Sequence, residues 1–413
     1  MSRPLSIIPN EIYLEIFDNI LPLDYVTKSD YYNTLSRMAV VCRFFASVAL
    51  PRIFGSITFS PLEASNCSRM SKLSRQIIEG VEPGASIALY VKECFIEHFL
   101  ADIEPDFFRS AFLSLSSKAM ARMSNIVSLT IHQTPIQDQL LSSISDLVNL
   151  KSLVFTECHI SAMQLTTLSL PRLTNFELTM CSYTDTDGFA KRIACPALNV
   201  LKADILFASE LPTSFYRHVK ELHLSSNPED TSTNPSSPSI AITQILSHCA
   251  SLTHLTLMSF ASVTPIWDIS LDIPVTLGIL PPPSLHSVEF RPCKSIKKVD
   301  TVIRVLRLCS GNAQLSESLR RLSLVCPYCS LEKWTLDIHY QRDHIIPSVC
   351  QGMPNVSCIR LDKIEWRREA ESGVWRPGIA RLLPCPEYNR NFNNCMVHSL
   401  VCLGVPHWPN LAE

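Results

Sequence analysis

The stretch LKSLVFTEC at residues 150–158 is followed by LTNFELTMC at residues 173–181. Both stretches place an apolar side chain at the first, fourth and sixth positions and a cysteine at the ninth. Side chains of a β-strand alternate between its two faces, so the fourth and sixth positions share one face. The pattern predicts a short strand in each stretch, with its apolar face buried.

This apolar frame recurs along most of the chain. Ten copies are recognisable: Val91-Cys94-Ile96, Ile126-Leu129-Ile131, Leu150-Leu153-Phe155, Leu173-Phe176-Leu178, Leu198-Leu201-Ala203, Val219-Leu222-Leu224, Leu252-Leu255-Leu257, Leu285-Val288-Phe290, Leu319-Leu322-Leu324 and Val356-Ile359-Leu361. Their first residues are 21 to 37 positions apart, closest in the middle of the chain. Repeats of 20–29 residues with this frame are typical of leucine-rich repeats, so we interpret the series as an irregular array of that kind.

Segments with helical spacing lie between the frames. Three of them carry apolar residues on one face: Leu140, Leu141, Ile144, Leu147 and Val148; Ile242, Ile245, Leu246 and Cys249; Val299, Val302, Ile303, Leu306 and Cys309. Alternating strands and helices in a repeat predict an α/β fold, a curved solenoid with parallel strands on the concave face and helices on the convex face. In four copies a Cys or Asn follows three residues after the frame, namely Cys158, Cys181, Asn227 and Cys293. In leucine-rich repeats such side chains turn inward and bond the backbone that leaves the strand.

Four regions follow from these patterns. Residues 5–55 are a short helix-rich block, interrupted by the polar stretch from Tyr25 to Asn33. Residues 56–90 form a linker with a capping helix, which the capping box at residues 60–63 starts. The repeat array covers residues 91–365, and residues 366–413 form a C-terminal cap with three tryptophans or a tail. Within the array, residues 225–239 hold three prolines and predict a surface loop.

Composition excludes several classes of protein. The 36 Lys and Arg nearly balance the 38 Asp and Glu, so no global basic field favours nucleic acid or a membrane as a partner. The 10 glycines form no nucleotide-binding loop, and no apolar run is long enough to span a membrane. The 16 cysteines are spread widely, with no secretory signal before them. We expect a cytoplasmic or nuclear protein with reduced thiols and no cofactor.

The N-terminal block has a distinctive series of short apolar motifs. They are Ile8-Pro9-Asn10-Glu11-Ile12, the doublets Ile16-Phe17 and Ile20-Leu21, and Val40-Val41-Cys42-Arg43-Phe44-Phe45. The series resembles the F-box, a family whose pattern begins L-P-x-E-I/L and later reads L-x-x-V-C-[KR]-x-W. Phe45 and Phe54 stand where the family most often has tryptophan, and the polar insert is longer than usual. The layout, with repeats after this block, is similar to F-box and leucine-rich-repeat proteins abundant in mushroom-forming fungi.

The resemblance implies a non-enzymatic role as the substrate-recognition subunit of a Skp–cullin–F-box ubiquitin ligase. The F-box would bind the Skp adaptor, and the repeats would bind a target protein that the sequence does not identify. Candidate adaptor contacts are Pro9, Ile12, Ile16, Phe17, Leu35, Val40, Cys42 and Phe44, without a division between core and interface. A helical cap on the first repeat, in a scaffold that does not engage the adaptor, is the alternative.

Two chemical interpretations compete with this one. Cys326-Pro327-Tyr328-Cys329 has the dithiol spacing of glutaredoxins, but no thioredoxin-like unit surrounds it. With His339 and His344 the same cysteines read C-x2-C-x9-H-x4-H, which suggests a zinc-binding module although the central spacing is short for a zinc finger. We favour cysteines that close a repeat strand and histidines on an exposed helix, with no metal bound. No motif indicates catalytic residues.

The predicted concave face is made by residues that alternate with the buried frame positions. Its polar members are Glu93, Glu97, Asn175, Asp204 and Arg360 together with eight candidate substrate contacts: Glu177, Lys202, Glu221, His223, His254, Glu289, Arg291 and Arg321. The early strands of this face are more acidic and the later ones more basic. A bound target is expected to carry the complementary polarity.

Overall fold

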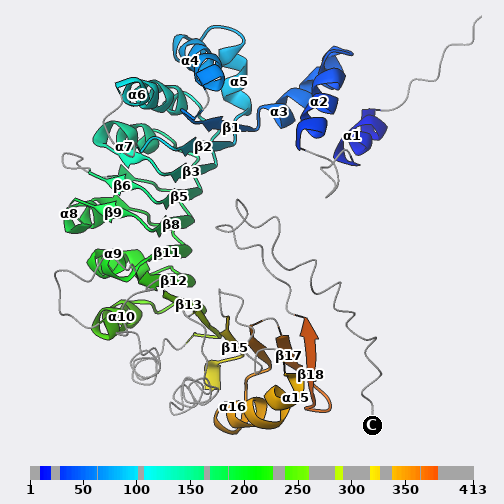
Figure 1. Cartoon of the computed structure of the whole chain (residues 1–413), viewed down its shortest axis with the longest axis vertical. Helices are drawn as coiled ribbons and strands as arrows, with labels where there is room; N and C mark the ends of the chain where they lie inside the picture. The colour runs from blue at the N-terminus through cyan, green and yellow to red at the C-terminus, as the bar shows by residue number, and fades with distance from the viewer. Residues whose placement is uncertain are drawn as a thin grey trace, which may run out of the picture.

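The computed structural model of the chain describes residues 10–19, 28–62, 64–100, 107–161, 168–184, 186–226, 238–259, 284–291, 317–325, 337–362 and 364–379. These residues form a mixed α/β structure around one large sheet (Figure 1). The sheet has thirteen strands in the order β1-β2-β3-β5-β8-β11-β12-β13-β14-β15-β16-β17-β18. The expected α/β class with a mostly parallel sheet is confirmed.

The strands follow the repeated frame along the sequence. They are β1 (Ser56–Phe59), β2 (Glu93–Glu97), β3 (Ser128–His132), β5 (Ser152–Thr156), β8 (Asn175–Thr179), β11 (Val200–Asp204), β12 (Glu221–Ser226), β13 (His254–Ser259), β14 (Ser287–Arg291), β15 (Arg321–Leu324), β16 (Cys358–Leu361), β17 (Ile364–Arg368) and β18 (Trp375–Ile379). From β1 to β16 every neighbouring pair is parallel. Equivalent frame positions pair directly, as Leu153 does with Phe176 and Phe176 with Leu201.

The frame residues of all ten copies are buried. The residues between them on each strand point to the opposite face, as the alternation of a strand requires. In-register pairing therefore collects the apolar side chains into one continuous core that runs from Ile57 and Phe59 to Trp366. A repeated sequence pattern thus becomes a repeated layer of the core.

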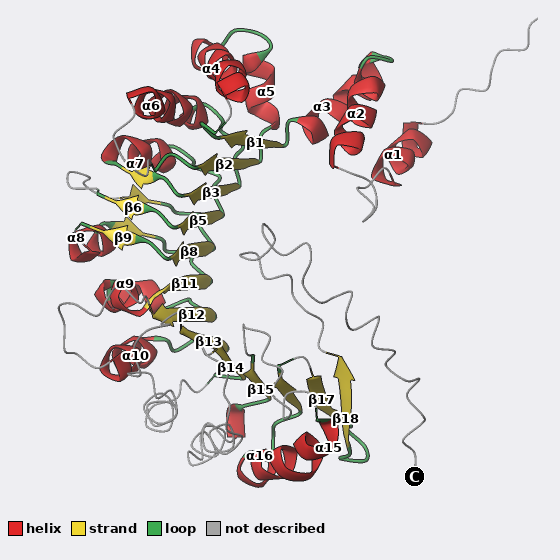
Figure 2. Cartoon of the chain, viewed as in Figure 1, coloured by secondary structure: helices red, strands yellow, loops and turns green. Residues whose placement is uncertain are grey.

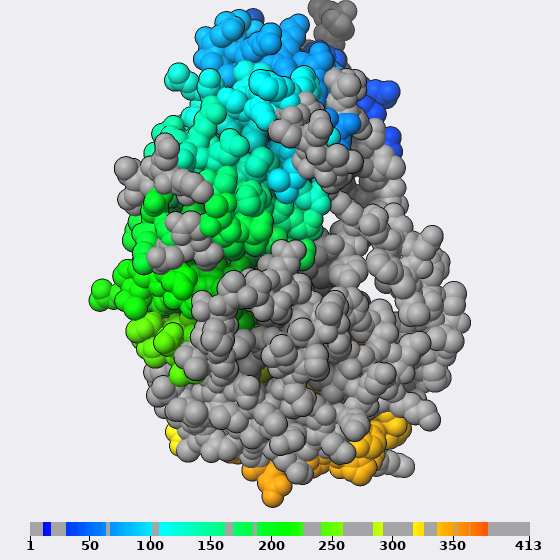
Figure 3. Space-filling view, turned by 60° about the vertical axis from the view of Figure 1, so that its left-hand side comes forward, coloured from blue at the N-terminus to red at the C-terminus, as the bar shows by residue number. Residues whose placement is uncertain are grey.

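Helices cover the face of the sheet on which the frame residues lie (Figure 2). They are α4 (Ala64–Glu79), α5 (Gly84–Tyr90), α6 (Phe107–Ala121), α7 (Asp138–Ser145), α8 (Thr186–Lys191), α9 (Ile205–Glu210), η1 (Thr213–Tyr216), α10 (Pro238–His248), α15 (Ile338–Tyr340), η3 (Gln341–Ile345) and α16 (Ile346–Gly352). The predicted helical faces at 140–148 and 242–249 are buried in α7 and α10, except Val148. Residues 299–309 lie outside the described ranges. The stack of strands curves, and the segments from α4 to α10 form one continuous body (Figures 1 and 3).

The cysteines that end two repeat strands act as the sequence suggested. The Cys158 Sγ donates to the carbonyl oxygens of Ile131 and Thr156, each at 3.3 Å. The Cys181 Sγ lies 3.6 Å from the oxygen of Phe155 and 3.5 Å from that of Thr179. A hydrogen bond with Cys158, together with burial, raises the pKa of Cys181. Such thiols are structural and unreactive. Asn227 and Cys293 lie outside the described residues.

Small additional sheets form where the chain leaves the main strands. One joins β4 (Pro135–Ile136), β6 (His159–Ile160) and β9 (Ser182–Tyr183), and another joins β7 (Leu168–Ser169) with β10 (Ile193–Ala194). Both are parallel and repeat the register of the main sheet. They give the backbone between strand and helix hydrogen-bond partners that it would otherwise lack.

The large sheet extends beyond both expected ends of the repeat array. Residues 56–59, expected in a linker, form β1, because Phe54, Ile57 and Phe59 have the frame spacing and Ile57 and Phe59 are buried. At the other end β17 and β18 continue the sheet in antiparallel orientation, although part of this hairpin was expected in a cap or tail. Its turn contains Gly373 at a φ of 67°, which suits glycine. The capping helix begins at Ala64 rather than directly at the predicted capping box.

Three helices precede the sheet: α1 (Asn10–Asn19), α2 (Lys28–Ala39) and α3 (Arg43–Ile53). Six residues of the stretch interpreted as a polar insert, Lys28 to Asn33, belong to α2. Ile53 packs in a small core among these helices, whereas its neighbour Phe54 packs against the core of the sheet. The helical block and the sheet therefore meet at this peptide bond. None of the helices in the described ranges is long and apolar enough to cross a membrane.

Candidate functional site

The helical block of α1, α2 and α3 has a core of its own. Phe17 of α1, Leu35 of α2 and Ala49 of α3 are completely buried in it. The Phe17 ring meets the Phe45 ring edge-on at 5.3 Å, and the Arg52 guanidinium donates to the Phe17 carbonyl oxygen. Phe17 and Leu35, both expected among the adaptor contacts, are therefore core residues: with no exposed surface, they cannot touch a partner directly.

Several large apolar side chains of the same block are exposed. Their exposed fractions are 45% for Ile12, 40% for Leu14, 47% for Ile16, 85% for Val40 and 65% for Val41. We call Ile12, Ile16, Val40 and Val41 the apolar patch; Leu14 is rotated by about 200° from Ile12 around α1 and faces another side of that helix. Ile12 and Ile16 are one helical turn apart and so form a stripe along α1. Tyr13 and Phe17, rotated by about 100° from that stripe, face α3 instead.

The ring contacts of Tyr13 place α1 beside the first turn of α3. The Tyr13 ring lies 5.2 Å from the Phe45 ring and 6.1 Å from the Phe44 ring. Phe44 and Phe45 are in the first turn of α3, directly after the turn that carries Val40 and Val41. Val41 was not among the expected contacts. Its position in the turn before α3, next to Val40, is the signal that could have found it.

Two other expected contacts have structural roles. Cys42 is exposed and caps α3, with its Sγ accepting a hydrogen bond from the Phe45 backbone N–H at 3.5 Å. Phe44 is half-buried against Tyr13. Pro9 lies outside the described residues. Among the expected adaptor contacts the structure therefore leaves Ile12, Ile16 and Val40 as the exposed apolar ones.

The second candidate surface is the face of the sheet opposite the helices, which we call the open face. All eight expected substrate contacts alternate with buried frame residues and so lie on it, in strands β8 to β15: Glu177, Lys202, Glu221, His223, His254, Glu289, Arg291 and Arg321. Lys202 pairs in register with Glu177 and with His223, and its ammonium is 2.9 Å from the Glu177 carboxylate. Glu289 and Arg291 form an ion pair within one strand.

His223 lies near the middle of the open face and is held neutral. Burial, followed by the nearby cations Lys202 and Arg291 and by the neighbouring His254 side chain, lowers the pKa of His223 to about 3. A neutral imidazole there can donate one hydrogen bond and accept another. Asp204, also expected on this face, is buried and caps α9 by accepting from the Phe207 N–H at 2.7 Å. It is therefore unavailable to a ligand.

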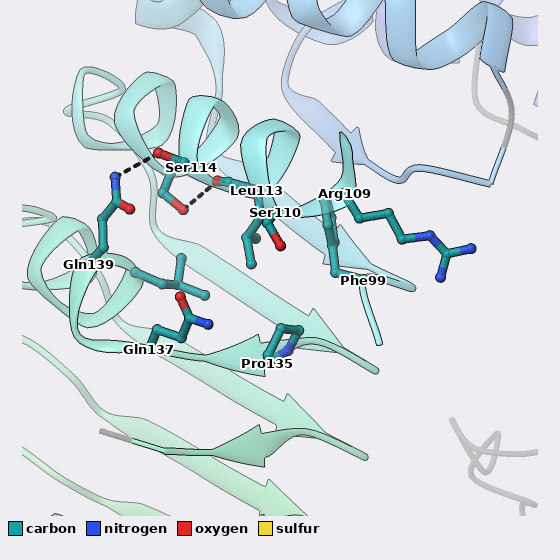
Figure 4. Close-up of a pocket in the computed structure, with 10 residues that line it drawn as sticks. Phe99, Arg109, Ser110, Leu113, Ser114, Pro135, Gln137 and Gln139 are labelled. Atoms are coloured by element: carbon teal, nitrogen blue, oxygen red, sulfur yellow. Dashed lines mark hydrogen bonds between the residues drawn. The ribbon is translucent and has the colours of Figure 1, made fainter. Parts of the chain in front are cut away.

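A pocket between α6 and α7 is too small for an organic ligand (Figure 4). It is lined by Phe99, Leu113, Pro135, Gln137 and Leu140 among others, and its volume is about 40 Å³. Ligand pockets are usually at least several hundred Å³. Gln139 bridges the two helices through the Ser114 hydroxyl, and Arg109 extends away from the pocket (Figure 4). The hydrogen bond from Gln139 to Ser114 therefore links α7 to α6.

The expected metal ligands are only partly described. His339 lies in α15 and His344 in η3, where its ring is 4.6 Å from the Tyr340 ring. Cys326 and Cys329 fall outside the described residues. Across the part of the chain that the structure describes, no three His, Cys, Asp or Glu side chains come together as metal ligands.

Comparison with known proteins gives no family for the chain: no protein-family model and no curated protein matches its sequence. The role of each surface is therefore inferred from the chemistry of its own residues. The apolar patch can be buried by a hydrophobic groove, and the open face offers charged and hydrogen-bonding groups to an extended ligand.

Proposed function

We propose that the protein is the substrate-recognition subunit of a Skp–cullin–F-box ubiquitin ligase. In this proposal α1, α2 and α3 form the F-box that binds the Skp adaptor, and the sheet is a leucine-rich-repeat solenoid whose open face binds the target protein. The protein itself is not an enzyme and works in the cytoplasm or nucleus. The observation that carries the proposal is the apolar patch of Ile12, Ile16, Val40 and Val41.

The apolar patch needs a partner for a physical reason. Each large aliphatic side chain that moves from water into a protein interior contributes about 1.5–3 kcal/mol. Clusters of exposed apolar residues on folded proteins commonly mark interaction sites. The block has already filled its own core with Phe17, Leu35 and Ala49, so a second protein is the way to bury the apolar patch. Helices that lay an apolar face into a groove are a recurrent mode of recognition.

The open face is suited to binding the target protein. Its polar residues come from many strands that are joined in register, so they form an extended surface. Such a surface fits a segment of protein better than a small substrate. The ion pair between Glu177 and Lys202 and the neutral His223 offer both charges and hydrogen bonds to it.

The direct test is binding of the full chain to the purified Skp adaptor, measured by calorimetry and co-elution. Ile12→Asp combined with Ile16→Asp should abolish binding, because both side chains are half-exposed and their charges would face the adaptor groove. The matched control, Val148→Asp with Val374→Asp, makes the same chemical change at exposed loop positions outside the helical block and should leave binding intact.

Two results would contradict the proposal. The wild-type chain could fail to bind the adaptor, or the Ile12 and Ile16 variant could bind as tightly as the control. Either result would favour the alternative, in which the three helices cap the first strand of a repeat scaffold that does not engage the adaptor. Zinc analysis of the same preparation tests the Cys326 and Cys329 module, since a stoichiometric metal lost in Cys329→Ser would establish it.

A further inference from the structure

The antiparallel hairpin at the end of the sheet places three arginines in one row of the open face. Arg321 of β15 pairs with Cys358 of β16, Cys358 pairs with Arg367 of β17, and Arg367 pairs with Arg376 of β18. Directly paired residues of neighbouring strands point to the same face. These three arginines therefore lie in one line across the open face, with Cys358 between Arg321 and Arg367. We call Arg321, Arg367 and Arg376 the arginine row.

The arginine row is accessible and of a defined length. The side chains of Arg321, Arg367 and Arg376 are 41%, 76% and 71% exposed. Neighbouring strands are about 4.8 Å apart, so three steps from Arg321 to Arg376 cover about 14 Å. An extended peptide rises about 3.3 Å per residue, and about five residues would span the row.

Positive charge exceeds negative charge around the arginine row. Arg360 lies in the adjacent row, paired with Glu365. The Glu365 carboxylate accepts from Arg321 at 2.8 Å and from Arg367 at 2.6 Å, so one carboxylate serves two guanidiniums. Burial works to raise the pKa of Glu365, but Arg367, Arg321 and Arg360 outweigh it and the pKa is lowered. With Glu369, which pairs with Arg376, four arginines face two carboxylates, an excess of two positive charges.

We propose that the arginine row binds an extended acidic segment of the target protein, with carboxylates spread over about five residues. A guanidinium has five N–H donors in a planar fork, so Arg367 and Arg376 can each keep their present partner and still bind a second carboxylate. The assignment rests on the proposed function, because it names the chemistry of the target that the open face would hold.

The row favours an acidic peptide over a nucleic acid. The chain as a whole has a net charge of −2, so no global basic field draws it to a continuous phosphate backbone. The Glu365 carboxylate lies between Arg321 and Arg367 and would repel closely spaced phosphates. A peptide can place its carboxylates at the flanks of Glu365, which an unbroken line of phosphates cannot.

The test uses the full chain and a fluorescent peptide in which glutamate and serine alternate. Arg367→Ser combined with Arg376→Ser should weaken binding on the order of tenfold, since two charge-assisted contacts are lost while Arg321 still neutralises Glu365. The control, Arg217→Ser with Arg342→Ser, removes the same charge from exposed arginines away from the row and should not change binding. A peptide that alternates lysine and serine should not bind.

Equal affinity of the row variant and its control for the acidic peptide would overturn the assignment. The assignment would also be overturned if the wild type bound duplex DNA more tightly than the peptide and the row variant lost that binding. This result would favour a polyanion site. Adaptor binding, measured on the same samples, keeps the two proposals apart. A chain that binds the peptide but not the adaptor would refute the ligase role alone, whereas the opposite result would refute the arginine row alone.

Discussion

The helical block and the sheet bury their apolar side chains to very different extents. In the sheet, each layer adds buried side chains to the core of its neighbours, and this core continues from β1 to β17. In the described part of the block, three side chains are completely buried, and the four residues of the apolar patch stay exposed. The sheet therefore has a large core of its own, whereas the block would gain stability if the proposed partner covered its apolar patch.

The difference also separates two kinds of interaction surface. The block presents apolar side chains beside a small core, so binding would depend on burial. The open face presents charges and hydrogen-bonding groups above a large core, so binding would depend on complementary polarity and would weaken as salt increases. Mutations that act on one core and not on the other can test this separation.

The largest effect is expected from Phe176→Ala in the core of the sheet. The ring is fully buried between Phe155 at 6.2 Å and Phe207 at 6.4 Å. Its removal leaves a cavity and should lower the free energy of unfolding by about 3–5 kcal/mol. Urea denaturation followed by circular dichroism measures this. Val148→Ala, at an exposed site, should cost less than about 0.5 kcal/mol.

Phe17→Ala should act on the block alone. It removes the central ring of the small core, with its contacts to Phe45 and Arg52, and should destabilise the block by up to about 3 kcal/mol. Proteolysis within residues 10–53 should become faster, while the urea midpoint of the sheet stays where it is in the wild type. A shift of that midpoint as large as the one from Phe176→Ala would show that both regions unfold as one unit.

Cys181→Ala tests the thiols that close the repeat strands. The substitution removes the thiol that donates to the carbonyl oxygens of Phe155 and Thr179, together with a buried sulfur, so it should cost about 1–2 kcal/mol in the sheet. Cys42→Ala, at an exposed position of the block, serves as the control and should leave the sheet transition unchanged. Equal sheet stability of both variants would refute the structural role of Cys181.

The smallest expected effect is a pH dependence from Asp204. Burial raises its pKa, and the hydrogen bonds from the Phe207 N–H and the Tyr183 hydroxyl offset this only in part. The folded state therefore keeps the Asp204 proton to a higher pH than the unfolded state does. The free energy of unfolding should therefore decrease as pH rises from the ordinary pKa of 3.8 through the raised value, because the folded state loses a proton there that the unfolded state has already lost.

Asp204→Asn removes this titration while keeping a side chain that can cap α9. Across that pH range the wild type should lose stability relative to the variant, as measured by urea unfolding at a series of pH values. The assignment of the raised pKa to Asp204 would be contradicted if the difference in free energy of unfolding between the two chains stayed constant. It would also be contradicted if the wild type became more stable relative to the variant as pH rises.

Local periodicity was enough to predict most of the sheet. The frame residues require only that apolar side chains recur on one face of a strand, and they are buried in all ten copies. The same pattern includes Phe54, Ile57 and Phe59, but Phe54 also completes the resemblance of the N-terminal block. Because Phe54 was assigned to the N-terminal motif, β1 was not predicted, although the spacing that identifies this strand is present.

The two interaction surfaces were predicted less completely. The sequence marks Ile12, Ile16 and Phe17 as apolar, but their division into an exposed stripe and a core ring depends on where α3 packs against α1. In the same way, Arg367 and Arg376 are ordinary charged residues in the sequence. They join Arg321 only because the hairpin turns back at Gly373 and pairs with β16.

The sequence by itself determined the repeat, the strand faces and the charges available on the open face, because each of these depends on neighbours a few residues apart. The tertiary structure alone decided which apolar residues of the block remain exposed and which arginines stand in one row. Those outcomes depend on contacts between segments that are distant in the chain, and local spacing carries no information about them.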